Sequence, residues 1–243
     1  MWKYIFSLAL IFLMGCSSSD EGPVYRIGVD PSWSPQNFMG REAAIRGFSG
    51  ELLQIIGNKE NFQPELLDTG PEFLEWGLKE GSLDAILTSL APSLNYEGIY
   101  LFSEPYLRIG PVLVVPINSS IKDLGDLNGK TIAVQRGSSA MGIIGTKVPR
   151  IVMMSYDRPG LVLENLLLGA YEAVTMPVLI AESYVHDIYK GQLKIVGMPL
   201  TEEALCLVTL ADNEMLIEDF NKGLQEIEKS GQYETLIRHW RIY

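Results

Sequence analysis

The side chains that most often carry out catalysis are scarce in this chain. It has 243 residues, with two histidines, His186 and His239, and two cysteines, Cys16 and Cys206. Nucleophilic and acid–base catalysis usually need such a residue beside a group that activates it. Cys206 lies in the apolar stretch Ala-Leu-Cys-Leu-Val, without a base near it in sequence, so we expect a buried core thiol. We find no candidate catalytic residue, no metal site and no need for a cofactor.

One segment has residues suited to holding a small anion. Gly137, Ser138 and Ser139 lie between a strand pattern and a helix pattern. The N–H groups at a helix start, together with the positive end of the helix dipole, suit a carboxylate. Gln135 and Arg136 precede them and could contribute to the same site. Two alternatives stay open: a serine here can serve only as the helix N-cap, and Arg136 can simply be solvated.

Short β-rich runs alternate with helical stretches along the chain and must position these residues. The pattern predicts strands over residues 25–29, 65–68, 84–88, 111–115, 131–135, 151–155, 173–175, 194–196 and 205–210. It predicts helices over residues 50–58, 72–80, 139–146, 160–168 and 178–189, and two closing helices around Leu216–Ile227 and Tyr233–Trp240. Such alternation is typical of an α/β protein with mostly parallel sheets.

Two segments look like connections between lobes. Proline and polar residues interrupt the strand patterns over residues 115–120, and a second interruption falls near residues 198–204. We therefore expect residues 24–114 plus 204–243 to form one lobe and residues 115–203 to form the other.

The first residues resemble an export signal. A short apolar run follows Lys3 and is too short to span a membrane as a helix. Leu-Met-Gly-Cys, ending at Cys16, resembles a bacterial lipobox and precedes a polar stretch. We expect residues 1–15 to be a lipoprotein signal peptide and residues 16–23 a tether with lipid on Cys16; the alternative is a plain secretory signal. The protein would then be extracytoplasmic, in the periplasm or at the cell surface, and held at the membrane by its lipid.

The overall charge argues against nucleic acid as a partner. The chain has 19 Lys and Arg against 30 Asp and Glu, for a formal net charge of −11. A protein that binds the phosphate backbone needs a basic surface, which this composition does not provide.

For the oligomeric state of the protein, we expect a monomer.

Several motifs resemble a known family, the bacterial extracellular solute-binding proteins of family 3, which are receptors of polar amino acid ABC importers. The matching stretches are Gly-Phe-Ser-Gly-Glu-Leu at 47–52, Gly-Ser-Leu-Asp at 81–84, Phe-Ser-Glu-Pro-Tyr at 102–106, Asp-Leu-Asn-Gly-Lys at 126–130 and Gly-Gln-Tyr at 231–233, followed by Trp240. The resemblance implies a two-lobed, type II periplasmic-binding-protein-like fold with a two-strand hinge. It also implies that a ligand binds between the lobes, at the ends of their strands.

The resemblance places Asp30 and Trp33 at the cleft, with the acid near the ligand and the aromatic ring over it. The flanking Pro31 and Pro35 restrict the backbone and would hold the ring in place. The alternative is that Trp33 is a loop anchor packed on its own lobe.

The sequence departs from the family where the ligand's charges should be held. Counted from Asp84, Tyr96 stands where amino acid binders have an arginine for the α-carboxylate, and Ala91 replaces a threonine in the rim. In the second lobe, Pro177 stands where an aspartate should take the ammonium group. The remaining candidates for ligand contact are Ser89, Leu90 and Met176. We therefore expect either an amino acid held differently or another small, partly apolar solute.

Three functions follow from these features. The first is a lipid-anchored receptor that captures a small polar solute and delivers it to an ABC permease. The second is an enzyme on the same fold, dehydratase-like or lytic, for which the predicted cleft offers no pair of acid and base. The third is a sensory or scaffold module that has lost amino acid binding.

Overall fold

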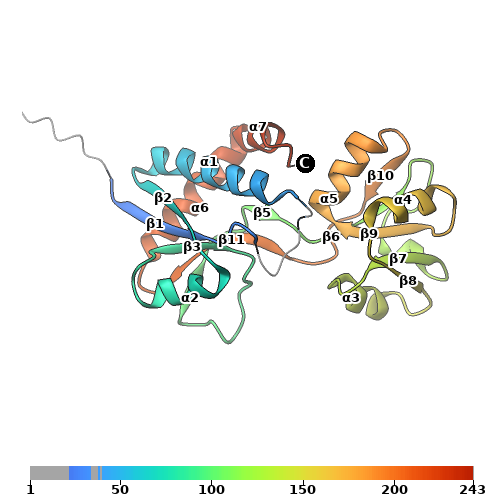
Figure 1. The fold of residues 1–243 in the computed structure, drawn as a ribbon, viewed down its shortest axis with the longest axis horizontal. Helices are drawn as coiled ribbons and strands as arrows, with labels where there is room; N and C mark the ends of the chain where they lie inside the picture. The colour runs from blue at the N-terminus through green and yellow to red at the C-terminus, as the bar shows by residue number, and fades with distance from the viewer. Residues whose placement is uncertain (1–21, 34–37, 39, 243) are drawn as a thin grey trace, which may run out of the picture.

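Two α/β lobes lie side by side in the computed structural model, which describes residues 22–33, 38 and 40–242 (Figure 1). Residues 1–15, Cys16 and the first part of the tether lie outside the described residues, so the signal peptide and the lipid site stay predictions. Among the described residues, no helix combines the length and the apolar character needed to cross a membrane.

Lobe 1 contains the first and the last part of the chain. Its sheet has the order β2-β1-β3-β11-β4, and β5 also pairs with β11. The strands are β1 (Val24–Val29), β2 (Gln63–Asp68), β3 (Ala85–Thr88), β4 (Tyr100–Phe102), β5 (Leu107–Arg108) and β11 (Ala204–Leu210). The helices are α1 (Glu42–Glu60), α2 (Pro71–Lys79), α6 (Glu214–Lys229) and α7 (Gln232–His239). Helices α1, α6 and α7 pack on one face of the sheet and α2 packs on the other.

Lobe 2 contains the middle of the chain, and its sheet has the order β10-β6-β9-β7-β8. The strands are β6 (Pro111–Pro116), β7 (Thr131–Gln135), β8 (Val152–Tyr156), β9 (Ala173–Pro177) and β10 (Leu193–Val196). The helices are α3 (Ala140–Lys147), α4 (Pro159–Leu167) and α5 (Val178–Ser183), with a 3-10 turn η1 (Leu124–Leu127) and a π turn η2 (Tyr184–Ile188). Separate apolar clusters fill the two faces of this sheet.

Both sheets are mixed, which corrects the expectation that they are mostly parallel. In lobe 1, β1 runs parallel to β2 and β3, whereas β11 is antiparallel to β3, β4 and β5. In lobe 2, β7 runs parallel to β8 and β9, whereas β6 is antiparallel to β9 and β10. The antiparallel pairings arise because β6 and β11 enter their sheets directly after the chain crosses between the lobes.

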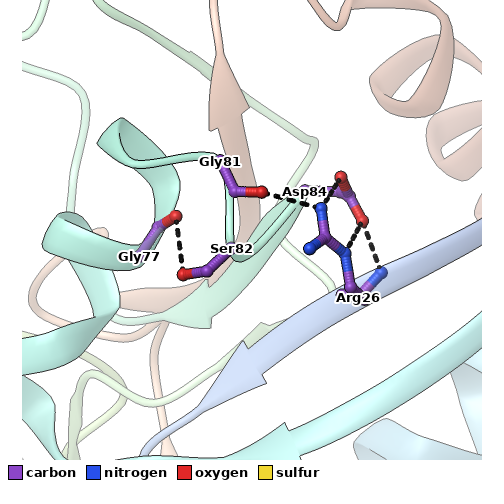
Figure 2. A network of polar contacts seen from close by, with 5 residues as sticks. All are labelled: Arg26, Gly77, Gly81, Ser82 and Asp84. Atoms are coloured by element: carbon purple, nitrogen blue, oxygen red, sulfur yellow. Dashed lines mark hydrogen bonds and ion pairs between the residues drawn. The ribbon is translucent and has the colours of Figure 1, made fainter.

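An ion pair fixes β1 against the turn that leads into β3 (Figure 2). Arg26 Nε and Nη2 donate to the two carboxylate oxygens of Asp84 at 3.0 and 2.8 Å, and the Arg26 backbone N–H donates to the same carboxylate at 2.8 Å. Arg26 Nη2 also donates to the Gly81 carbonyl at 2.9 Å. The matching motif Gly-Ser-Leu-Asp at 81–84 therefore has a structural role, in holding β1 and β3 together.

The chain crosses between the lobes at residues 109–110 and again at residues 200–203. The backbone N–H groups of Ile109 and Gly110 both donate to the Glu203 carbonyl, at 3.0 and 3.2 Å, so the two connections run beside each other. This corrects the predicted boundary after residue 114 and the predicted connection at residues 115–120, because all of β6 belongs to the second sheet. The prediction missed this because a strand that starts at the crossing looks like a continuation of lobe 1.

Candidate functional site

A cavity of about 300 Å³ lies where the two lobes meet the crossing segments. Lobe 1 contributes Phe38, the connections contribute Ile109 and Glu203, and the start of β6 contributes Pro111. Lobe 2 contributes the other lining residues, which are Gln135, Arg136, Gly137, Ser138, Ser139 and Pro177. This volume is at the lower end of the range for small-molecule sites and suits a ligand of few heavy atoms.

The lobe 2 wall is the turn between β7 and α3, as the sequence predicted. Gly137 has φ of 76°, a left-handed conformation that glycine adopts without a steric penalty, and it turns the chain into the helix. The Ser138 hydroxyl accepts a hydrogen bond from the Ala140 N–H at 3.2 Å, so this serine has the local capping role left open above. Ser139 is exposed and its side chain makes no capping hydrogen bond, so its hydroxyl is available to a ligand.

Arg136 lines the same wall but has a partner of its own. Its Nε donates to Asp157 Oδ1 at 2.9 Å, and both side chains are 67% exposed. This hydrogen bond raises the pKa of the Arg136 guanidinium, which stays positively charged. Because the pair is exposed, an anionic ligand can compete for the guanidinium at little cost.

Trp33 does not line the cavity in this conformation, and its predicted position over a ligand stays a prediction. Its side chain is 3% exposed within the lobe 1 core, where Nε1 donates to the Glu42 carbonyl at 3.3 Å. It packs edge-on against Phe38, with ring centroids 6.4 Å apart, and Phe38 is the aromatic residue that reaches the cavity. The alternative considered above, a loop anchor, describes Trp33 correctly in this conformation.

Asp30 has a local role in the same loop. Its carboxylate accepts hydrogen bonds from the Ser32 N–H at 2.8 Å and from the Ser32 hydroxyl at 2.7 Å, and the residue is 4% exposed. Its carbonyl accepts from the Trp33 N–H at 2.9 Å, and Trp33 has φ of 57°. Asp30 does not line the cavity; its hydrogen bonds fix the tight turn at Ser32 and Trp33.

The four candidates after β3 also lie outside this cavity. Leu90 and Tyr96 pack against the apolar cluster under α2, with the Tyr96 ring 5.5 Å from Tyr100 and 6.4 Å from Phe102. Ser89 is half-buried and Ala91 is exposed, and neither lines the cavity. A ligand contact of these four residues stays a prediction that requires the lobes to move closer.

Met176 is 1% exposed in the lobe 2 core and does not line the cavity, so its contact with a ligand stays a prediction. Its neighbour Pro177 lines the cavity as predicted, since side chains alternate along β9.

The sequence analysis missed four of the lining residues, Phe38, Ile109, Pro111 and Glu203. Phe38 comes five residues after Trp33, and the two aromatic residues could not be ranked without knowing which one is buried. Glu203 falls in the predicted second connection. A charged residue at a crossing between lobes could have identified it as a candidate for the site.

The described residues contain no group of three or more His, Cys, Asp and Glu side chains able to hold a metal ion. Cys206 lies in the lobe 1 core, where burial, followed by the charge of Glu104, raises the pKa of its thiol to about 11. The thiol is therefore protonated at neutral pH, in agreement with the predicted core role.

Two α/β lobes joined by two adjacent connections, with a cavity at the junction, define a type II periplasmic binding protein. The profile of the bacterial extracellular solute-binding proteins, family 3, matches residues 25–242, and the chain belongs to this family. This confirms the resemblance and the fold class proposed from the motifs.

Curated relatives match nearly the whole of this chain at low sequence identity. It is 25% identical over 235 residues to the arginine-binding extracellular protein ArtP of Bacillus subtilis, covering 94% of this chain and 92% of ArtP. It is 22% identical over 247 residues to the L-cystine-binding protein TcyJ of Escherichia coli, covering 97% and 92%. It is also 26% identical over 223 residues to the virulence sensor protein BvgS of Bordetella bronchiseptica, covering 90% of this chain and 18% of BvgS.

The solved structures agree on the fold. The unliganded, open L-cystine solute receptor of Neisseria gonorrhoeae superposes with a TM-score of 0.71 at 19% identity, covering 91% of this chain and 93% of that one. The second substrate-binding domain of a putative amino acid ABC transporter from Streptococcus pneumoniae gives a TM-score of 0.67 at 22% identity, covering 89% and 99%.

Proposed function

We propose that this protein is a solute receptor of an ABC importer, without catalytic activity, that captures a small amino acid or amino-acid-like solute between its lobes. The observation that carries the proposal is the cavity at the lobe junction, which has a helix start and Arg136 on one wall and Glu203 on another. Such a cavity offers groups of both charge signs to one small ligand. Relatives named for binding arginine and cystine support the same ligand class.

In this proposal, ligand binding changes the relative orientation of the two lobes. A solute that contacts both lobes stabilises the conformation in which the lobes enclose it, and the permease recognises that conformation. Tyr96 and Pro177 stand where the family has charged residues, but this does not exclude an amino acid as the ligand. In this cavity Arg136 and Glu203 carry the charges instead.

The membrane attachment is proposed from the sequence. The Leu-Met-Gly-Cys motif and the polar residues after it support cleavage before Cys16 and acylation of its thiol. Labelling cells with a fatty acid probe tests this: Cys16→Ser should abolish the label and release the protein from the membrane fraction.

The binding proposal is tested by thermal unfolding of the purified protein with each standard L-amino acid and L-cystine. A receptor should gain stability from one or a few members of this panel, by an amount that grows with ligand concentration. Mass spectrometry of small molecules that co-purify would identify a ligand outside the panel. If neither experiment yields a ligand, the receptor function is wrong.

A sensory module is the second candidate, because the match to BvgS covers nearly the whole of this chain but a small part of that sensor protein. Growth on the identified solute separates the two functions. Deleting a receptor should abolish high-affinity uptake, whereas deleting a sensory module should leave uptake unchanged.

A further inference from the structure

Glu203 is the one carboxylate among the ten described residues that line the cavity. It lies in the second connection, and its carbonyl accepts the N–H groups of Ile109 and Gly110 at 3.0 and 3.2 Å. The crossing of the two connections therefore fixes the backbone of Glu203. The residue is half-buried, so its charge is partly removed from water.

The adjacent Glu202 is an acid in the same connection that faces solvent, and it serves as a comparison for Glu203. The Glu202 side chain is 94% exposed and pairs with Arg108 at 3.0 Å, and it does not line the cavity. Neighbouring residues in an extended segment point to opposite sides, which sends one acid outward and the other to the cavity. The two residues thus share chemistry and sequence position and differ in what they face.

The wall formed by the β7–α3 turn has the opposite electrostatic character. It combines the start of an eight-residue helix with the Arg136 guanidinium and the exposed hydroxyl of Ser139. Both the helix start and the guanidinium favour an anionic group, so a ligand carboxylate is held best on this wall. A ligand that also carries a cationic group then has Glu203 as its acidic partner within the same cavity of about 300 Å³.

We infer that Glu203 accepts the α-ammonium group of the bound solute and selects ligands that carry one, an inference that rests on the proposed amino acid receptor. Glu203 thereby takes over the role of the acid that Pro177 replaces at the end of β9. Because the acid belongs to a connection, its contact with the ligand links binding directly to the relative orientation of the lobes.

The test compares Glu203→Gln with Glu202→Gln as the matched control. Calorimetry is done with the amino acid from the panel that stabilises the wild type most, and with its 2-hydroxy acid analogue, in which a hydroxyl replaces the amine. The glutamine keeps the shape of Glu203 and removes only its charge. We expect Glu203→Gln to weaken the amino acid at least tenfold, and to weaken the 2-hydroxy acid less than threefold. Glu202→Gln should bind both ligands within twofold of the wild type.

The outcomes separate the possible failures. Equal weakening of both ligands by Glu203→Gln would show a structural role and overturn the inference, as would unchanged binding of both. Equal effects of Glu203→Gln and Glu202→Gln would show that only the general field of the acids matters. If the wild type binds no member of the panel and no ligand co-purifies, the proposed function fails, and the inference fails with it.

Discussion

The Asp84 carboxylate joins the start of β3 to β1, because it accepts hydrogen bonds from the backbone and the side chain of Arg26. The Arg26 hydrogen bonds lower the pKa of Asp84 below its usual value. We expect Asp84→Asn to lower the free energy of unfolding by about 1–2 kcal/mol, since hydrogen bonds to a charged group at a partly buried site are lost. Urea unfolding at pH 7 measures this. The control is Asp68→Asn, whose partner is Arg46 and whose side chain is 55% exposed, with an expected loss below about 0.5 kcal/mol.

The same pair predicts a pH dependence with a defined sign. A carboxyl group whose pKa is lowered in the folded state adds stability above its unfolded pKa of about 4, and this is lost as pH falls through the folded value. The advantage of the wild type over Asp84→Asn should therefore be constant near neutral pH and shrink below about pH 4. A difference that stays constant down to pH 2 would contradict the role given to Arg26.

Substitutions of Trp33 distinguish a role in the core from a role in ligand binding. Because the side chain is 3% exposed, Trp33→Ala should destabilise the ligand-free protein by about 3–5 kcal/mol. Trp33→Phe keeps a ring in the core and should cost clearly less. Thermal unfolding without ligand decides between the roles: if Trp33→Ala unfolds like the wild type, the ring is not a core residue.

At the scale of elements, hydrophobic periodicity predicted most strands and helices of the fold. The predicted strand over residues 131–135 coincides with β7, and the predicted helix over residues 160–168 differs from α4 by one residue at each end. The short strands β4 and β5 were missed, because two or three residues are too few to show a period. Their positions depend on pairing with β11, which is distant in sequence.

The site was predicted less completely than the fold, for a related reason. The turn from Gln135 to Ser139 was found because a helix start has a local signature. The choice between Trp33 and Phe38, and the isolation of Tyr96 from the cavity, depend on which residues the core buries. Burial of a loop residue is decided by tertiary packing, which no local pattern reports.

The crossing of the two connections depends on one glycine. A Cβ atom at Gly110 would lie 2.5 Å from Thr201 Oγ1 and 2.8 Å from the Thr201 carbonyl oxygen, closer than van der Waals contact allows. We expect Gly110→Ala to push the connections apart, to weaken ligand binding at least tenfold and to lower the unfolding temperature. Gly142→Ala is the control, because nothing lies within 4 Å of a Cβ there and alanine favours the helix.

Calorimetry and thermal unfolding of both glycine variants measure these effects. Gly142→Ala should bind ligand like the wild type and unfold at the same or a higher temperature. Wild-type behaviour of Gly110→Ala would show that the connections can separate without cost, and that their close packing does not set the lobe orientation.

At the scale of the whole molecule, the two lobes also touch beside the connections, where α5 of lobe 2 contacts lobe 1. In Figure 1, α5 and α7 lie above the connections and α3 lies below them. Leu179 of α5 is buried in the core cluster of lobe 1, and Arg41 Nη1, at the start of α1, donates to Ser183 Oγ of α5 at 2.5 Å. A hollow of about 560 Å³ lies beside these contacts, lined by residues of β5, α5 and α7.

We expect these contacts to oppose closure of the cavity in the proposed receptor. If closure moves α5 away from α1, it breaks the hydrogen bond from Arg41 to Ser183, and this contact then stabilises the described orientation over a closed one. A ligand that binds the closed form must overcome this difference in free energy, which lowers its apparent affinity.

Arg41→Ala should therefore increase ligand affinity about two- to fivefold and reduce the radius of gyration of the ligand-free protein in X-ray scattering. Arg238→Ala, at the hollow between α5 and α7, should change neither, since the Arg238 side chain hydrogen-bonds to Thr235 within its own helix. Weaker ligand binding by Arg41→Ala would mean that the contact persists in the closed form and that the lobes move about another axis.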